Sequence, residues 1–258
     1  MIGVFDSGVG GLTVLSSVAQ LMPNTSLIYV ADRAHAPYGD LTEAKLLQRS
    51  RLITQWLIAQ GCSLIVIACN TATALAIDTL REEFDLPIVG VEPGVKPAAI
   101  SSQSHCIGIM ATENTVASSR YKRLLERFMP SVKIISQGCM GLADAIEQDS
   151  NKIAALLERY SQPLISAGAD QLVLGCTHYP LVKDQLSALV GRKIQIVDTS
   201  DAVALEVKRR YLNVPNTEEQ NASIALFSTG SDLSINRTVR AYASLSWLIE
   251  TPVQFCDI

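Results

Sequence analysis

The sequence has few aromatic residues and little excess charge, and these shortages exclude several classes of protein. Phe, Trp and Tyr make up 5% of the 258 residues, too few for the stacking surfaces that bind single-stranded nucleic acids. The formal net charge is −4, so a basic surface for DNA or for an anionic membrane is not expected. No apolar run approaches the ~20 residues that span a bilayer. We therefore expect no nucleic-acid partner and no membrane partner.

Signals for export, for structural zinc and for common cofactors are also missing. Met1 leads directly into an apolar strand pattern without a basic leader, which predicts a cytoplasmic protein. None of the six cysteines forms a C-x-x-C pair, so neither a structural zinc site nor a disulfide framework is expected. The sequence contains no P-loop, no G-x-G-x-x-G and no pyridoxal-lysine motif. These absences predict chemistry without a metal or a cofactor.

The same short phrase occurs once in each half of the chain. Residues 61–71 read G-C-S-L-I-V-I-A-C-N-T and residues 168–178 read G-A-D-Q-L-V-L-G-C-T-H, so that Cys69 aligns with Cys176 without a gap. Each cysteine follows an apolar run and precedes small polar residues, which is typical of a buried parallel strand that ends in a loop. Ligands bind at the carboxyl ends of such strands. The alignment predicts two thiols at equivalent positions of two related halves.

The repeat extends to the other strand patterns. I-G-V-F at 2–5 resembles I-G-I-M at 107–110, and further patterns occur at 26–31 and 87–91 in the first half and at 132–136 and 193–197 in the second. Helical patterns alternate with them, which predicts an α/β fold of two pseudo-symmetric domains, each with a mainly parallel sheet flanked by helices. The alternative is that strands of any α/β protein share this composition without a duplication.

The expected domain limits are residues 1–97 plus 210–258 for the first domain and 98–209 for the second, with the active site in the cleft between them. A last strand is expected at 223–229, and the polar segments 213–221 and 230–232 are interpreted as turns. The helix expected at 42–60 begins after Thr42 as its N-cap and places Lys45 and Arg49 on an exposed face.

A glycine-rich turn follows the first strand, where residues 6–13 read D-S-G-V-G-G-L-T. Such a turn at the start of a helix presents backbone N–H groups that favour an anion. Three interpretations remain open for it: a carboxylate site, a phosphate site and a plain tight turn.

Two thiols that face one cleft can remove a proton from one side of a carbon atom and return a proton to the other side. A thiolate is a base with an ordinary pKa of ~8.5, and a helix N-terminus lowers that value. His178 either steers or protonates the Cys176 thiol or makes only structural hydrogen bonds, and Asp6 is expected at the same sheet edge as Cys69. Hydroxyl and amide side chains at the other strand ends are candidates for holding carboxylates: Ser7, Asn70, Thr71, Thr112, Thr115 and Thr177.

Five motifs taken together carry a family resemblance. They are F-D-S-G-V-G-G-L-T at 5–13, P-Y-G at 37–39, A-C-N-T-A at 68–72, A-T-x-x-T at 111–115 and L-G-C-T-H-Y-P at 174–180. In this order the sequence resembles the glutamate racemases, cofactor-independent enzymes of the aspartate/glutamate racemase superfamily. The resemblance implies that Cys69 and Cys176 are the two bases, one for each enantiomer. It also implies that Asp6, His178 and Glu147, which follows a G-C-M loop at 138–140, assist these thiols.

The resemblance also implies a substrate and a biological role. Glutamate would be held by Ser7, Pro37, Tyr38, Gly39, Asn70, Thr71, Thr112, Thr115 and Thr177. The product D-glutamate would enter peptidoglycan synthesis, and thereby cell-wall biogenesis and cell shape, and the enzyme would be a homodimer.

Three alternatives stay open. The first is an aspartate racemase or a related dicarboxylate isomerase, and the second is a glutamate-binding protein without activity. The third is a thiol hydrolase with a Cys176–His178 dyad, which residues two apart form only where the loop bends.

Overall fold

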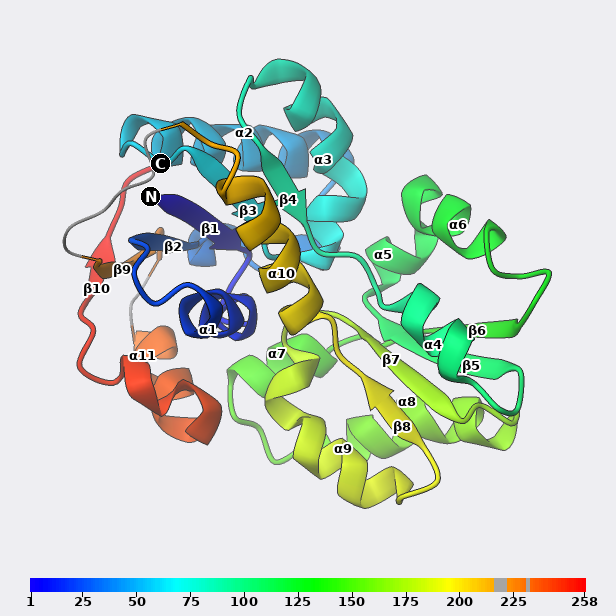
Figure 1. The fold of residues 1–258 in the computed structure, drawn as a ribbon. Coiled ribbons are helices and arrows are strands. Elements are labelled where there is room, and N and C mark those ends of the chain that lie inside the picture. The colour runs from blue at the N-terminus through cyan, green and yellow to red at the C-terminus, as the bar shows by residue number, and fades with distance from the viewer. Residues whose placement is uncertain (216–221, 231–232) are drawn as a thin grey trace.

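Two parallel β-sheets lie beside each other in the computed structural model, which describes residues 1–215, 222–230 and 233–258 (Figure 1). The first sheet has the order β10-β9-β2-β1-β3-β4 and consists of β1 (Ile2–Asp6), β2 (Leu27–Ala31), β3 (Leu64–Ile67), β4 (Ile88–Gly90), β9 (Ile224–Ser228) and β10 (Val253–Phe255). The second has the order β6-β5-β7-β8 and consists of β5 (Cys106–Ala111), β6 (Lys133–Gly138), β7 (Gln171–Gly175) and β8 (Gln195–Val197). Of the segments interpreted as turns, 216–221 and 231–232 lie outside the described residues.

The expected α/β fold with two parallel sheets is confirmed. β2-β1-β3-β4 and β6-β5-β7-β8 share one strand order, as the sequence repeat predicted. The strand expected at 223–229 is β9, which pairs in parallel with β2. The edge strand β10 was not predicted, because three residues near the end of the chain carry no readable alternation.

Helices cover both faces of each sheet. They are α1 (Leu12–Leu21), α2 (Glu43–Ala59), α3 (Asn70–Glu83), α4 (Val95–Ser101), α5 (Glu113–Ala117), α6 (Ser119–Glu126), α7 (Leu142–Glu147), α8 (Ile153–Ser166), α9 (Lys183–Val190), α10 (Ser200–Tyr211) and α11 (Leu233–Ala241). Short 3₁₀ turns add η1 (Arg33–His35), η2 (Tyr38–Asp40), η3 (Tyr179–Val182) and η4 (Ala243–Leu248). We call the first sheet with α1–α3, α10 and α11 the first lobe, and the second sheet with α4–α9 the second lobe.

Alternating strand residues face different helix layers. In β1, Val4 packs in the core that includes α1 and α10, whereas its neighbour Phe5 packs with α2 and α3. In β5, Ile109 packs with α4 and α6, whereas Met110 faces the core that includes α8. Strands buried on both faces in this way form near-continuous apolar runs, which is the signal the sequence carried.

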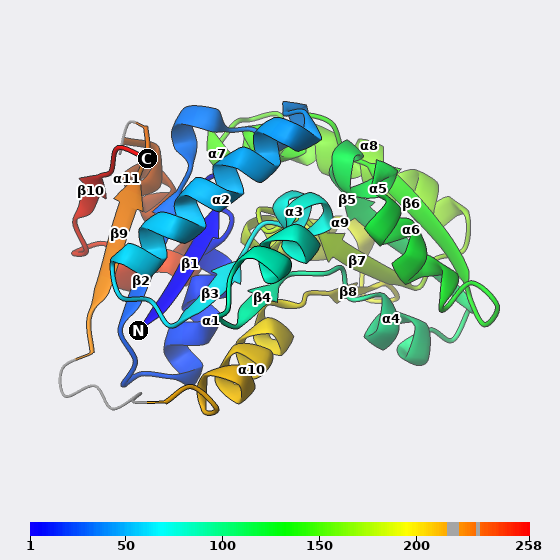
Figure 2. The same ribbon diagram turned by 90° about the horizontal axis from the view of Figure 1, so that it is seen from above.

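The domain limits expected from the sequence remain a prediction. Helix α10, at the end of the expected second domain, packs against α1 and contacts β4, and its Asp201 accepts a hydrogen bond from Ser17 over 2.9 Å. Helix α4 straddles the expected boundary at 97 and contacts β5 and β7. Figure 2 shows α10 beside α1 of the first lobe, whereas α4 lies with the second sheet.

Helix α2 is where the sequence prediction was wrong in one respect. Thr42 caps it as expected, accepting a hydrogen bond from the backbone N–H of Lys45 over 3.4 Å. Arg49, however, is buried rather than exposed. Its guanidinium donates to both carboxylate oxygens of Asp32, over 3.0 Å and 2.9 Å, and to the backbone carbonyl of Ile258 over 2.7 Å. The buried face of α2 therefore includes a charged residue, because a carboxylate from the end of β2 pairs with it.

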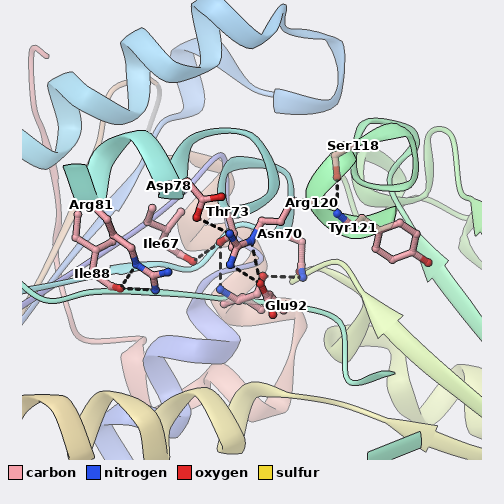
Figure 3. Close-up of polar contacts among 11 residues, drawn as sticks. Ile67, Asn70, Thr73, Asp78, Arg81, Ile88, Glu92, Ser118, Arg120 and Tyr121 are labelled. Atoms are coloured by element: carbon pink, nitrogen blue, oxygen red, sulfur yellow. Dashed lines mark hydrogen bonds and ion pairs between the residues drawn. The ribbon is translucent and has the colours of Figure 1, made fainter. Parts of the chain in front are cut away.

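An ion-pair cluster joins α6 of the second lobe to α3 and to the segment after β4 in the first lobe (Figure 3). Arg120 of α6 donates to Glu92, which follows β4, over 2.9 Å and 2.6 Å, and to Asp78 of α3 over 2.5 Å. Close by, Asn70 donates to the carbonyl of Val91 over 3.2 Å, so the first residue of α3 is fixed to the segment that leaves the first lobe. Arg120 therefore ties the middle of α3 and the segment after β4 to the second lobe, while Asn70 ties the start of α3 to that same segment.

No helix in the described residues is long and apolar enough to cross a bilayer.

Candidate active site

A cavity of about 90 Å³ lies where the carboxyl ends of strands from both sheets meet. Twelve of the residues selected from the sequence line it: Ser7, Pro37, Tyr38, Gly39, Cys69, Asn70, Thr71, Thr112, Glu147, Cys176, Thr177 and His178. Asp6 and Thr115 do not line it, although both contact residues that do. The two thiols thus face one cavity and come from equivalent strands of the two lobes.

Cys69 occupies the N-cap of α3, directly after β3. Its sulfur accepts a hydrogen bond from the backbone N–H of Ala72 over 3.4 Å, and its S–H points to the hydroxyl of Ser7 at 3.9 Å. Burial and, after it, the nearby charge of Asp6 raise the pKa of Cys69 to about 12, because they outweigh the hydrogen bonds from Ala72 and Ser7 that lower it. The expectation that a helix N-terminus would lower the pKa of this thiol was therefore wrong, because loss of water outweighs one amide.

Cys176 is the first member of a chain of three side chains. Its sulfur lies 3.7 Å from Nδ1 of His178, and Nε2 of His178 lies 2.8 Å from Oε2 of Glu147. The loop after β7 bends at once, with the N–H of Tyr179 donating to the carbonyl of Cys176 over 3.1 Å. This bend is the condition that the sequence analysis set for Cys176 and His178, two residues apart, to meet.

His178 is buried among acidic groups. Burial alone lowers its pKa, but the hydrogen bond and charge of Cys176, together with the charges of Asp6 and Asp144, raise the pKa above its ordinary value. Glu147, itself 8% exposed, accepts from the opposite side of the ring. The arrangement favours the imidazolium form, which can stabilise a thiolate at Cys176.

The family assignment follows from comparison with known proteins. The model of the Asp/Glu/Hydantoin racemase family matches residues 11–207. The chain belongs to this family. A glutamate racemase from Ectopseudomonas mendocina is 48% identical over 212 residues, which cover 81% of each chain.

Solved structures agree with this assignment. The structure of glutamate racemase isoform RacE1 from Bacillus anthracis superposes with a TM-score of 0.86 at 28% identity, covering 100% of this chain and 97% of that one. Escherichia coli glutamate racemase, solved with L-glutamate and the activator UDP-MurNAc-Ala, gives a TM-score of 0.86 at 29% identity, covering 98% and 96%. The protein is accordingly an amino-acid racemase, an isomerase.

In this racemase the glycine-rich turn brings the first lobe against the second. A Cβ atom added to Gly10 would lie 2.5 Å from Nδ1 of His178 and 2.7 Å from its backbone nitrogen, and one added to Gly8 would lie 2.5 Å from a carboxylate oxygen of Glu147. The N–H of Gly8 donates to Asp6 over 2.8 Å, so this amide is not available to an anion. The turn therefore depends on glycine for close contact between the lobes.

Asp6 connects the lobes below the cavity. It is fully buried, and its second carboxylate oxygen accepts from the hydroxyl of Thr177 over 3.0 Å. Burial raises the pKa of Asp6, and the charge of His178 with hydrogen bonds from Gly8 and Thr177 opposes this only in part. Asp6 thus acts on both thiol environments through its charge rather than as part of the cavity wall.

Three threonine hydroxyls form a cluster at the meeting point of two helix N-termini. Oγ1 of Thr71 lies 2.9 Å from Oγ1 of Thr112, which lies 2.8 Å from Oγ1 of Thr115. Thr71 lies in the first turn of α3, and Thr112 caps α5. Among the described residues, no Lys or Arg lines the cavity, so a carboxylate there would be held by hydroxyl and amide donors.

Several cavity residues were not selected from the sequence. They are Ala36, Asp40, Glu113, Cys139, Met140, Gly141, Ala143 and Asp144. Most come from the loop before α7 and from α7 itself, which lie outside the two cysteine phrases and the repeated strand patterns. Arg33 was also missed: it forms an ion pair with Glu147, and nothing in the order of the sequence links a loop after β2 to a helix of the other lobe. In the described part of the chain, no group of three or more His, Cys, Asp or Glu side chains is arranged to hold a metal ion.

We expect the Cys69 thiol of the resting enzyme to react slowly with iodoacetamide. With a pKa of about 12, only about one thiol in 10⁵ is ionised at pH 7, and the thiolate is the reactive form. The rate of Cys69 alkylation, followed by peptide mass spectrometry, should therefore rise about tenfold for each pH unit between 7 and 10. A rate that levels off near pH 8 would show that the thiol has an ordinary pKa.

Proposed function

We propose that the protein is a glutamate racemase that interconverts L- and D-glutamate by two-base proton transfer at Cα, and so supplies D-glutamate for peptidoglycan synthesis. One observation carries this proposal: Cys69 and Cys176 line the same cavity from opposite lobes. The names of the relatives and the L-glutamate in the Escherichia coli structure support glutamate as the substrate. The homodimer and the cytoplasmic location remain predictions.

In each direction one thiol would be the base and the other the acid. The thiolate first removes the α-proton and leaves a planar carbanion, and the opposite thiol then delivers its own proton to the other face, which inverts the centre. General acid–base catalysis requires each sulfur within hydrogen-bond reach of the proton it moves. The raised pKa of Cys69 makes its thiolate a stronger base for a weak carbon acid, and the α-ammonium group of bound glutamate would offset the cost of ionising it.

The side chains around each thiol would have separate tasks. His178, with its raised pKa, would stabilise the thiolate of Cys176, and Glu147 would hold the imidazole ring in place. Asp6, whose charge acts on Cys69, would assist on the other side. The carboxylates of the substrate would be held by backbone and side-chain donors of Ser7, Tyr38, Gly39, Asn70, Thr71, Thr112 and Thr177, while Pro37 would shape the cavity wall without donating and Thr115 would position the hydroxyl of Thr112.

The test is to incubate the protein with L-glutamate, and separately with L-aspartate, in ²H₂O without added cofactor. We expect D-glutamate by chiral chromatography and deuterium at the α-carbon by NMR, with aspartate at least tenfold slower. Faster turnover of aspartate than of glutamate would show that the protein is an aspartate racemase instead. Glutamate binding without deuterium uptake would indicate an inactive binding protein. An acyl-enzyme detected by mass spectrometry would instead favour the alternative of a thiol hydrolase with a Cys176–His178 dyad.

A further inference from the structure

We propose that Arg33 is a positioning residue for the Cys176 side of the reaction, which holds Glu147 from the opposite lobe and through it fixes His178. The inference rests on the proposed function and adds a residue that the family motifs do not include. It predicts that the two half-reactions respond differently to one substitution outside the cavity.

Four side chains form the line from the cavity to Arg33. The sulfur of Cys176 lies 3.7 Å from Nδ1 of His178, Nε2 of His178 lies 2.8 Å from Oε2 of Glu147, and Oε1 of Glu147 is paired with Nη1 of Arg33. Each carboxylate oxygen of Glu147 thus has its own partner, one from each lobe. The ion pair to Arg33 and the hydrogen bond to His178 together restrict the Glu147 carboxylate, and with it the orientation of the histidine ring.

The first lobe confines Glu147 on a second side. A Cβ atom at Gly8 would approach both carboxylate oxygens, at 2.5 Å and 2.9 Å, so the backbone of the glycine turn already lies against this group. Arg33 is in η1, after β2, and its side chain is 24% exposed. The first lobe therefore helps to position Glu147, although the residue belongs to α7 of the second lobe.

Cys69 is held by a different set of groups. Its sulfur contacts the hydroxyl of Ser7 and the N–H of Ala72, and Arg33 is not among the residues that line the cavity. Loss of Arg33 should consequently disturb the proton transfer at Cys176 and leave that at Cys69 nearly intact.

The charges around Cys176, His178, Glu147 and Arg33 determine whether replacing Arg33 raises or lowers the pKa of His178. The groups that face His178 are Cys176, Asp6, Asp144 and Glu147, and those that face Arg33 are Glu147, Asp144, Asp6, Tyr29 and, with like charge, Arg237. Replacing Arg33 by a neutral residue removes one positive charge from this cluster. The pKa of His178 should then rise by about one unit, because the imidazolium loses a repulsive neighbour.

The experiment compares Arg33→Met and Arg33→Lys with the control Arg51→Met. Arg51 forms a comparable pair with Glu83, over 2.6 Å at both oxygens, far from the cavity on α2 and α3. We expect Arg33→Met to lower kcat about tenfold, Arg33→Lys to recover most of that loss, and Arg51→Met to match the wild type. Because enantiomers have equal free energy, kcat/KM must stay equal in the two directions, so that ratio carries no information.

The decisive readout is the primary isotope effect with α-deuterated L- and D-glutamate. A slower Cys176 step raises the isotope effect for the enantiomer that Cys176 deprotonates and lowers it for the other, since reprotonation then limits the rate. In Arg33→Met the two isotope effects should move in opposite directions. A loss of kcat with both effects unchanged would show that Arg33 has only a structural role and would overturn the proposal.

A second readout needs no substrate. The pKa of His178 in ¹³C-histidine-labelled protein, followed by NMR, should rise by about one unit in Arg33→Met and stay within ~0.3 unit in Arg33→Lys and Arg51→Met. An unchanged pKa would contradict the proposal even if the protein racemises glutamate. A shifted pKa without glutamate turnover would instead refute the proposed function and leave the contact standing. Arg33→Gln replaces the methionine variant if circular dichroism shows that the latter is unfolded.

Discussion

Replacing Cys69 or Cys176 by alanine is expected to lower glutamate racemisation by at least about 10³-fold in both directions, because each direction uses one thiol as base and the other as acid. The two effects are not additive: the double variant should be no slower than either single one, since one missing group already stops the transfer. The rates are followed by circular dichroism of glutamate starting from each enantiomer.

A matched control separates chemistry from folding. Cys106 is also a buried thiol, at the start of β5, but it does not line the cavity. Cys106→Ala should therefore keep turnover within about threefold, whereas Cys69→Ser and Cys176→Ser, which preserve shape but not basicity, should be nearly as inactive as the alanine variants. Either alanine variant with turnover within tenfold of the wild type would refute the two-base mechanism.

Replacing Asp32 by alanine is expected to lower the free energy of unfolding by about 3–5 kcal/mol. Asp32 is fully buried and accepts hydrogen bonds from Arg49, Tyr38 and Thr229. Without it the guanidinium of Arg49 stays buried and charged but loses both of its hydrogen bonds to the Asp32 carboxylate. Because Tyr38 also lines the cavity, the variant should lose affinity for glutamate as well as stability.

Urea unfolding tests this prediction, with Glu83→Ala as the control. Glu83 pairs with Arg51 through two bonds of 2.6 Å, but this pair is partly exposed, so its loss should cost much less stability than the loss of Asp32. Equal costs for the two variants would show that burial of the Asp32 pair adds nothing.

The pH dependence of the Asp32 variant has a defined sign. Burial alone raises the pKa of Asp32, but the hydrogen bonds from Arg49, Tyr38 and Thr229 lower it below its ordinary value overall. A carboxylate with a depressed pKa stabilises the folded state above its unfolded pKa of ~3.9, and this contribution disappears as the pH falls through the folded value. The difference in stability between wild type and Asp32→Ala should therefore be full at pH 7 and shrink below about pH 4.

The fold class and the placement of the two cysteines at strand ends follow from local signals in the sequence. The apolar strands ending in small polar residues place Cys69 and Cys176 at sheet edges, and a shared strand order brings those edges together. What could not be predicted depends on contacts between distant segments. Arg49 looks exposed from its helical pattern because its partner comes from another element, and the pKa of Cys69 depends on burial that the local sequence does not encode. The family roles assigned to Asp6 and Glu147 gave no hint of their lobe-crossing partners, Thr177 and Arg33.

The close packing of the glycine turn against His178 and Glu147 has a consequence for exchanging parts between relatives. Three contacts between the lobes each pair one residue of the first lobe with one of the second. They are Gly10 against His178, Asp6 against Thr177, and Arg33 against Glu147. A chimaera that takes one lobe from a homologue would still contain both cysteines. Its contacts between the lobes, however, would pair residues that come from two different proteins. Such hybrids should regain turnover when residues 6–11 and 33 are transplanted together with the lobe that contains their partners.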